Sequence, residues 1–491
     1  MTPERLLRAL GLAGGLLLVF VTPPFHVPDE PAHFLRAYQI ATGAAAEPGP
    51  GGGIGYRLPA SLPQLAELCT AGVAFHPGRR LEPGLLAAAW RLPLAPERRV
   101  FLPAGSLTLY TPAPYLAAAA AVAAGRLLAP RPLALLYLAR LGNLAAALAV
   151  SWIAVRIAPA QRWLLALLAL TPMAMFERSS ASADALTNAL PLLLVSCLLS
   201  LVLRRVGEPA GEGGCRPAGS ATRRSVLLLA TAFLLAAAKG VYFLLDLLVF
   251  LVPPVVRAEG RAAGGARARA VAGLWVGGLA AAVAGAGISV WVTHRVAGLG
   301  SLLLGVQPEA QLRGVLAAPL HFLGLAAADY LHRLPRYAAG FVGTFGWLDT
   351  PLPRPSMVLW GLLLLAAALT GGDPSLALAG WQRQLAMAIT AAVLLLLSLS
   401  QYVTWTPLGA GFVDGLQGRY FLPVAPVAAI LLYNRRFAAR GTGSSLAAAG
   451  SAAPATPAAA GWPYAGWLYG GLSVAFTVLT LLCIWFRYHG A

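Results

Sequence analysis

Residues 6–33, LLRALGLAGGLLLVFVTPPFHVPDEPAH, join an apolar N-terminal segment directly to a stretch that carries an acidic pair. The segment 6–21 resembles a signal peptide, but it ends at two prolines without the small-residue site at which such peptides are cut. We therefore interpret it as a retained first membrane helix. This helix would bring the acidic pair, Asp29 and Glu30, to the membrane surface.

Composition defines the broad class of protein. Hydrophobic residues make up 58% of the 491 residues and charged residues only 11%, which predicts an integral membrane protein with many spans. A net charge of +18 would suggest nucleic-acid binding in a soluble domain, but here the arginines lie in short loops between apolar runs. We therefore expect no nucleic-acid partner. The four cysteines are scattered and predict neither a disulfide framework nor a zinc site.

The apolar runs predict an all-α, multi-pass fold with about eleven transmembrane helices. These runs cover residues 6–21, 133–157, 163–176, 184–203, 226–238, 241–256, 271–292, 357–369, 385–403, 420–433 and 464–486. The apolar stretch Ala113–Ala129 is interpreted as a surface or half-inserted helix. With that choice the arginine-rich loops all fall on the side of the N-terminus, which the positive-inside rule places in the cytoplasm.

This topology divides the chain into three parts. Residues 1–440 form the main transmembrane domain, and residues 22–112 within it form a large first extracytoplasmic loop with surface helices. Residues 441–461, rich in Ala, Ser, Gly and Pro, predict a low-complexity cytoplasmic linker. Residues 462–491 then hold a last transmembrane helix. The N-terminus is expected in the cytoplasm, with the long loops outside.

Two interpretations of the acidic pair remain open. Asp29 can cap a helix that runs to about Thr42 and ends before Gly43. Capping would leave Glu30 without a structural role, and His33 lies one turn beyond Asp29, where it could orient the carboxylate. A carboxylate in this position could also act as general base for an acceptor hydroxyl or amine.

Other polar residues interrupt the apolar pattern at the expected outer face. Asp184 could cap the helix that it begins, or act beside Asp29. Lys239 could reach the lipid interface as a snorkelling side chain, or bind a lipid-linked phosphate. Arg419, with Gln417 and Tyr420 beside it, could anchor a lipid headgroup or bind phosphate oxygens with its planar fork.

In this order, the motifs of the chain resemble a bacterial membrane-protein family called domain of unknown function 2142. The motifs are Pro28–Phe34 (PDEPAHF), Tyr110–Pro112 with Tyr115, Ser182–Leu186 (SADAL), Lys239–Tyr242 (KGVY), Gly346–Thr350 (GWLDT) and Gly415–Pro423 (GLQGRYFLP). The family itself resembles the GT-C glycosyltransferases, such as protein mannosyltransferases and the aminoarabinose transferase of lipid A. The resemblance implies transfer of a sugar from a polyprenyl-phosphate donor to an acceptor at the outer face.

The resemblance also implies roles for individual residues. Asp29 matches the catalytic carboxylate, Glu30 its acidic neighbour and Asp184 a second outer carboxylate. Lys239 resembles a lysine at an outward turn of the mannosyltransferases, whereas Arg419 and Gln417 have no counterpart there. From the chemistry of the residues, we expect the donor phosphate to lie near Lys239, Arg419 and Gln417. Supporting roles fall to His33, Tyr110, Tyr242, Trp347, Asp349 and Tyr420. The first loop has no Asp-x-Asp metal signature, so neither a divalent metal nor another cofactor is expected.

Two other classes of function stay open. A transporter or flippase of lipid-linked sugars would use the same charges to guide a headgroup, but it would favour polar groups near mid-span, where Asp246 is the main example. A non-catalytic scaffold for envelope assembly is allowed if the acidic pair is inert. The sequence identifies neither the sugar nor the acceptor, which could be a glycan, a lipid or a protein.

Overall fold

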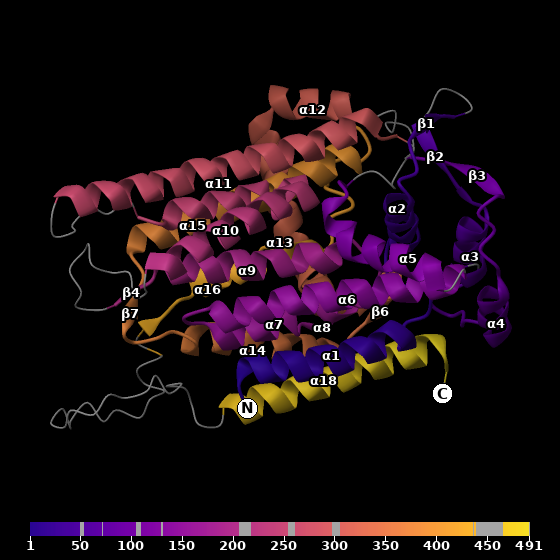
Figure 1. Ribbon diagram of the computed structural model, residues 1–491, viewed down its shortest axis with the longest axis horizontal. Coiled ribbons are helices and arrows are strands. Elements are labelled where there is room, and N and C mark those ends of the chain that lie inside the picture. The colour runs from indigo at the N-terminus through magenta and orange to yellow at the C-terminus, as the bar shows by residue number, and fades with distance from the viewer. Residues whose placement is uncertain are drawn as a thin grey trace.

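The computed structural model describes residues 1–49, 54–70, 72–104, 110–128, 131–205, 218–253, 261–296, 305–435, 437 and 465–490. In these ranges the chain is mainly helical, and its long helices run side by side along the long axis of the molecule (Figure 1). The linker predicted at 441–461 and parts of the arginine-rich loops, at 206–217 and 254–260, lie outside the described residues.

Five helices of the described chain are long and apolar enough to cross a membrane. They lie in α6 (Pro132–Ile157), α9 (Asp184–Val202), α11 (Arg261–Val296), α15 (Gly380–Thr404) and α18 (Ala465–Tyr488). The helices α12 (Pro308–Ala317) and α13 (Pro319–Gly343), bent by 106°, make a sixth span if they count as one. The expectation of about eleven transmembrane helices is therefore wrong, and the last predicted run forms a helix that is long and apolar enough to span.

Prolines and charges explain several of the missing spans. Pro172 divides one apolar run into α7 (Arg162–Ala169) and α8 (Pro172–Arg178). The run 420–433 contains two prolines and forms only short turns of helix, η5 (Gly418–Phe421), η6 (Ala425–Val427) and α16 (Ala428–Leu431). The helix α1 (Pro3–Val21) carries three charged residues. Shorter apolar runs lie in α10 (Ala218–Ala238), η4 (Gly240–Leu251) and α14 (Arg354–Thr370).

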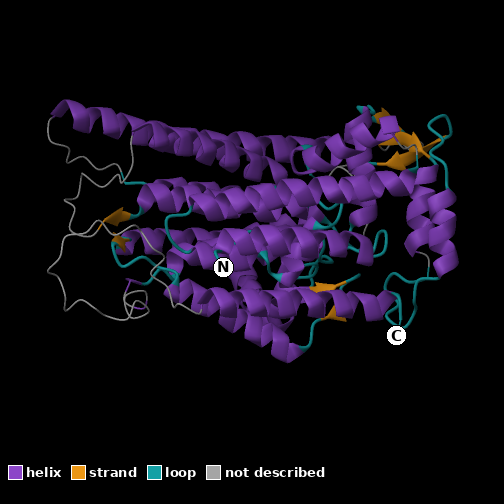
Figure 2. Cartoon of the chain, turned by 60° about the horizontal axis from the view of Figure 1, so that its bottom comes forward, coloured by secondary structure: helices purple, strands orange, loops and turns teal. Residues whose placement is uncertain are grey.

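The first long loop builds a compact cap on one end of the bundle. It contains α2 (Glu30–Thr42), α3 (Ser61–Thr70) and α4 (Pro83–Arg91), together with a three-stranded antiparallel sheet of β1 (Glu47–Pro48), β2 (Ile54–Pro59) and β3 (Arg99–Pro103). Figure 2 shows this sheet at the end of the bundle opposite to β4 (Arg204–Arg205) and β7 (Leu376–Ala377). The surface helices were predicted, but the sheet was not.

The stretch Ala113–Ala129 forms η3 (Ala113–Tyr115) and α5 (Leu116–Leu128), which packs on α6 and α2. Its helix is too short to count among the candidate spans. Ala118, Ala119 and Val122 give it a buried face of small residues. The prediction of a separate short helix here is confirmed, and its place relative to a membrane stays a prediction.

The first and last helices lie side by side and run in the same direction (Figure 1). A side chain at Gly466 would meet the backbone of Met1 at 2.7 Å, and at the other end the ring of His489 lies 3.0 Å from the carbonyl oxygen of Val21. Glycines allow α1 to approach its neighbours closely, because a Cβ at Gly14 would lie within 2.8 Å of side chains from α8 and α18. The N-terminus and the start of α18 therefore share one end of the bundle.

Candidate functional site

Asp29 directly precedes α2, but its side chain does not cap that helix. Its backbone φ of 63° is left-handed, which is uncommon for a residue other than glycine, and the side chain forms no cap hydrogen bond. Instead, Oδ2 accepts a hydrogen bond from Nη2 of Arg419 at 2.6 Å. The helix bounds and the end at Gly43 are as predicted, but the capping interpretation of the carboxylate is wrong.

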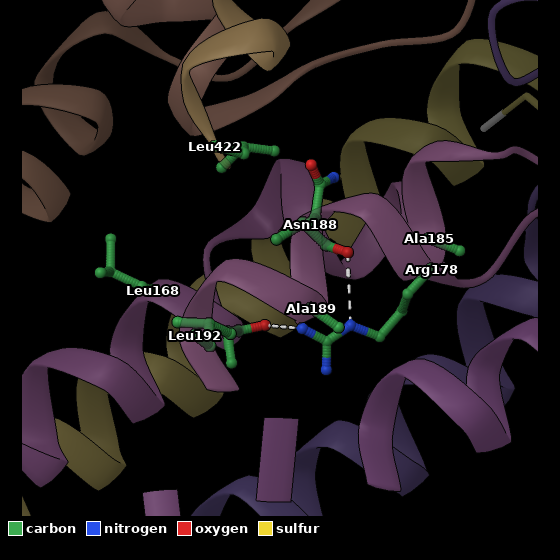
Figure 3. A pocket seen from close by; sticks show the side chains of 9 residues that line it. Leu168, Arg178, Ala185, Asn188, Ala189, Leu192 and Leu422 are labelled. Atoms are coloured by element: carbon green, nitrogen blue, oxygen red, sulfur yellow. Dashed lines mark hydrogen bonds between the residues drawn. The ribbon is translucent and has the colours of Figure 1, made fainter. Parts of the chain in front are cut away.

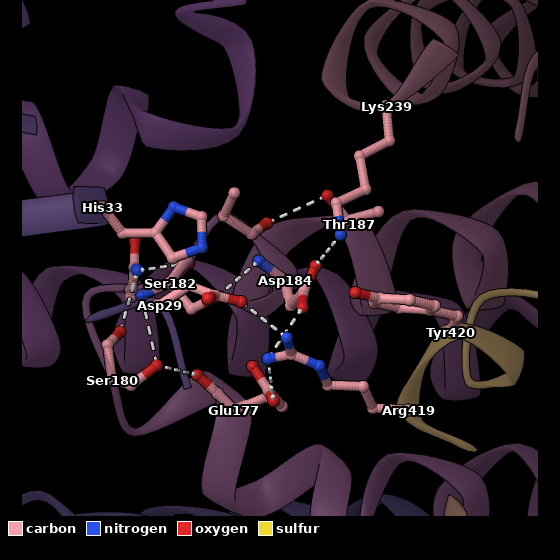
Figure 4. Close-up of polar contacts among 12 residues, drawn as sticks. Asp29, His33, Glu177, Ser180, Ser182, Asp184, Thr187, Lys239, Arg419 and Tyr420 are labelled. Carbon is pink, nitrogen blue, oxygen red and sulfur yellow. Dashed lines mark hydrogen bonds and ion pairs between the residues drawn. The ribbon is translucent and has the colours of Figure 1, made fainter. Parts of the chain in front are cut away.

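Arg419 is the centre of a buried ionic cluster (Figure 4). It is only 3% exposed, so it does not serve as a headgroup anchor at the surface. Besides binding Asp29, its Nη1 lies 3.3 Å from Oε1 of Glu177 and 3.8 Å from Oδ2 of Asp184. One guanidinium therefore holds three carboxylates that come from three separate segments of the chain.

Lys239 neutralises Asp184 from the other side. Its ammonium forms an ion pair with Oδ1 of Asp184, and the residue is 7% exposed, which is inconsistent with a snorkelling side chain. The rings of Tyr110 and Tyr420 flank the ammonium, with ring centres 4.8 and 5.3 Å from Nζ. Thr111 ties this part of the first loop to α10 by a hydrogen bond of 2.6 Å to the carbonyl oxygen of Ala237.

Exposure separates Asp29 from the other acids of the cluster. Its side chain is 55% exposed, whereas the side chains of Glu177 and Asp184 are 0% and 8% exposed. Partial burial tends to raise the pKa of Asp29, but Arg419 outweighs that effect and holds the pKa below its ordinary value. At neutral pH the cluster therefore presents an ionised and accessible carboxylate on a rigid support.

His33 faces the cluster from α2 as a neutral ring. Its Nδ1 lies 2.8 Å from the hydroxyl of Tyr115, and the ring is buried. Burial lowers the pKa of His33 to about 4, although the charges of Asp29 and Asp184 act in the opposite direction. His33 is therefore suited to hold a hydrogen bond rather than to titrate near neutral pH.

Glu30 points away from Asp29 and has a structural role that the sequence did not indicate. Both of its oxygens bind the guanidinium of Arg140, at 2.8 and 2.6 Å, and they also accept backbone N–H groups of Phe25 and Ala181. Arg140 donates further hydrogen bonds to the carbonyl oxygens of Val19, Thr22 and Pro23. This fully buried pair joins the end of α1, the start of α2 and the loop before α9 to α6.

The motif at 346–350 lies in a second polar group. Asp349 accepts hydrogen bonds from Arg487 at 2.7 and 3.2 Å, and Arg487 also donates to the carbonyl oxygen of Arg79 at 2.6 Å. The ring of Trp347 packs on Phe75 with centres 4.8 Å apart. Asp349 and Trp347 therefore join the first loop to α18 and are not brought into the cluster around Arg419.

The remaining candidates surround η5. Tyr242 donates a hydrogen bond of 2.9 Å to the carbonyl oxygen of Tyr420, which positions the residue after Arg419. Gly418 lies against α13, where an added Cβ would come within 2.1 Å of the carbonyl oxygen of Tyr337. Oε1 of Gln417 is buried without a hydrogen-bond partner in the described part of the chain. Gln417 therefore lies beside the cluster but is not among the residues that bind Arg419.

Sequence reasoning missed Glu177 and Arg140, and both gave a usable signal. Arg140 interrupts the apolar run 133–157, and a charge inside a span requires a nearby partner. Glu177 directly follows the run 163–176 and lies seven residues before Asp184. Neither position identifies its partner from sequence alone, because the partners lie more than a hundred residues away in the chain.

A small cavity is lined by residues close in the chain to those of the cluster (Figure 3). Its lining residues include Arg178, Ala185 and Leu422, which follow closely after Glu177, Asp184 and Arg419 in the chain. The cavity holds about one water-sized sphere, with a volume near 10 Å³. It is too small to hold a sugar.

Glu177 gives the cluster a pH dependence that a variant can test. Burial raises the pKa of Glu177 to about 7 even though Arg419 acts to lower it, so folding takes up a proton that the unfolded chain releases at lower pH. Stability should therefore fall as pH rises from about 4.5 to about 7. Glu177→Gln should match the intact protein in melting temperature at pH 5 and exceed it at pH 8. Equal melting temperatures at pH 8 would contradict this assignment.

The chain was compared with known protein families, with curated proteins and with solved structures. The family model described as "Predicted membrane protein (DUF2142)" matches residues 12–428, which include the whole ionic cluster. No curated protein and no solved structure shows significant similarity to the chain.

Proposed function

This chain belongs to the DUF2142 family of predicted membrane proteins, and we propose that it is a membrane glycosyltransferase. It would transfer a sugar from a polyprenyl-phosphate donor to an acceptor in the cell envelope. The observation that supports this most is Asp29, the exposed and ionised carboxylate of an otherwise buried cluster. The proposed location is the outer face of a bacterial cytoplasmic membrane.

The proposed chemistry is a single displacement. The acceptor oxygen or nitrogen attacks the anomeric carbon of the sugar, the bond between that carbon and the donor phosphate breaks, and the configuration inverts. Polyprenyl phosphate leaves with the bonding electrons. Asp29 orients the acceptor group and takes up its proton as the new bond forms. A low pKa makes Asp29 a weak base, so proton transfer would come late, after most of the new bond has formed.

The buried cations would serve this reaction by positioning. Arg419 fixes Asp29 by a hydrogen bond of 2.6 Å, and Lys239 with Arg419 balances the charge of the buried carboxylates, so the cluster holds Asp29 in one position. The rigid support matters because the carboxylate must keep hydrogen-bond distance to the acceptor. No step of this scheme requires a metal or another cofactor.

The first test is transfer of radiolabelled sugar from a panel of polyprenyl-phosphate sugars into envelope material. Membranes that carry the intact protein should transfer label from at least one donor and release polyprenyl phosphate in equal amount. Membranes from the same cells without the protein are the control. Transfer from no donor in the panel would count against a glycosyltransferase.

A transporter of lipid-linked sugars is the second candidate, and Asp246 is the observation that favours it. This carboxyl group lies in η4, is 1% exposed, and has no hydrogen-bond partner for either oxygen in the described chain. Polar groups of this kind within membrane helices often mark transport paths. Movement of a labelled lipid-linked sugar across proteoliposome membranes, without transfer to any acceptor, would favour this function.

A further inference from the structure

The two cations first assigned to the donor phosphate are already engaged. Lys239 pairs with Asp184, and Arg419 pairs with Asp29, Glu177 and Asp184. Three carboxylates thus face two cations, and an incoming phosphate would have to displace one of them. A phosphate is better bound by a cation that lacks a counter-charge.

Arg36 is such a cation. It lies on α2, is 6% exposed, and forms no ion pair within the described part of the chain. A buried guanidinium without a counter-charge is costly, so an anionic ligand at this position would be strongly favoured.

The guanidinium of Arg36 has hydrogen-bonding capacity that its present contacts do not use. Nη1 donates to Oε1 of Gln39 at 2.7 Å, but its contact to the Tyr56 hydroxyl and the Nη2 contact to the carbonyl oxygen of Tyr110 are both 3.4 Å long. Nε is buried without a partner. Phosphate oxygens bind a guanidinium at about 2.7–2.9 Å, so they would replace two weak contacts and satisfy Nε.

Arg36 also lies on the side of α2 that faces the cluster. His33 and Arg36 lie three residues apart within α2, the spacing of one helix face, and His33 faces the cluster. Tyr110 connects this face to the cluster, because its carbonyl oxygen contacts Arg36 and its ring lies over Lys239. A phosphate at Arg36 would therefore lie about two helical turns along α2 from the carboxylate of Asp29.

We propose that Arg36 binds the phosphate group of the lipid-linked substrate, an inference that rests on the proposed function. Asp29 and Arg36 then divide the site, with the acceptor at the carboxylate and the phosphate at the guanidinium. The sugar lies between them along the face of α2, next to His33 and Tyr110. Lys239 and Arg419 hold the carboxylates in place and contact no phosphate oxygen directly.

The test compares two lipids that differ only in charge. Affinities of the purified full-length protein for undecaprenyl phosphate and for uncharged undecaprenol are measured in the same detergent. The intact protein should prefer the phosphate. Arg36→Gln should weaken the affinity for undecaprenyl phosphate about 10- to 100-fold, because charge-assisted hydrogen bonds to the phosphate are lost. The affinity for undecaprenol should stay unchanged.

Arg57→Gln is the matched control, since Arg57 lies beside Tyr56 on β2 with a side chain that is 56% exposed and pairs with Glu47. It changes the net charge equally and should keep the preference for phosphate. If Arg36→Gln does not fold, Arg36→Lys tests the role of Arg36 instead. A lysine keeps the positive charge but lacks the planar guanidinium that donates two parallel hydrogen bonds to a phosphate. It should weaken phosphate binding up to about tenfold, and unchanged affinity would overturn the assignment.

The outcomes separate this inference from the proposed function. An intact protein that binds both lipids equally would overturn the donor class, and the inference with it. A preference for undecaprenyl phosphate that survives Arg36→Gln would overturn the role of Arg36 alone and leave the donor class in place.

Discussion

Asp29→Asn should lower the turnover of sugar transfer by about 10²- to 10⁴-fold, the range that a positioned general base contributes. The substitution keeps the size of the side chain and an oxygen that can accept from Arg419, so the cluster should stay folded. It replaces the carboxylate, which takes up the proton of the acceptor group, with an amide that cannot act as a base at neutral pH. Initial rates are measured with saturating donor at equal amounts of membrane protein.

Asp414→Asn provides the matched control for this variant. Asp414 is exposed in the loop after α15, where its Oδ1 accepts a hydrogen bond from the backbone N–H of Gly415. The two substitutions change the net charge equally, so a general electrostatic effect would appear in both. Asp29→Asn with normal turnover, at an unchanged melting temperature, would remove Asp29 from catalysis and shift attention to Asp184.

The acidic pair, Asp29 and Glu30, shows which structural features the local sequence can predict. Its place after a first helix and the bounds of α2 follow from local signals, namely the apolar run, Pro31 in the first turn and Gly43 at the end. The directions of the two side chains do not. Asp29 adopts a left-handed backbone and turns to Arg419, while Glu30 turns into the bundle toward Arg140. Those partners lie 390 and 110 residues away, where local patterns carry no information.

Most of the cluster was nevertheless predictable from its residue types. Asp29, Asp184, Lys239 and Arg419 each break an apolar pattern, and the structure brings all four together. Their pairing was not predictable, because each had a plausible local role as cap, interface anchor or snorkelling side chain. The hydropathy pattern, in contrast, overestimated the number of membrane spans. It counted each apolar run as a span, whereas prolines at 172, 423 and 426 divide two of those runs into short helices.

Glu30→Gln and Arg140→Gln should each destabilise the protein by about 3–5 kcal/mol, the cost of leaving one member of a buried ion pair without its partner. Both side chains are 0% exposed. Replacing both with apolar residues should not restore stability fully, because Arg140 also binds three backbone carbonyl oxygens that would lose their donors. The free energy of unfolding is measured for the protein in a mild detergent. Heat or denaturant unfolds it, and the loss of helical signal monitors the transition.

The control for this pair is Arg162→Gln, which breaks the ion pair between Arg162 and Glu4. Because the side chain of Arg162 is 43% exposed, this change should lower the free energy of unfolding by about 1 kcal/mol or less. The same variants decide what Glu30 does. If its role is structural, the folded fraction of Glu30→Gln keeps its transfer activity even though the protein melts at lower temperature. Lost transfer at an unchanged melting temperature would instead make Glu30 part of the catalytic machinery, and the ion pair with Arg140 would then serve to position it.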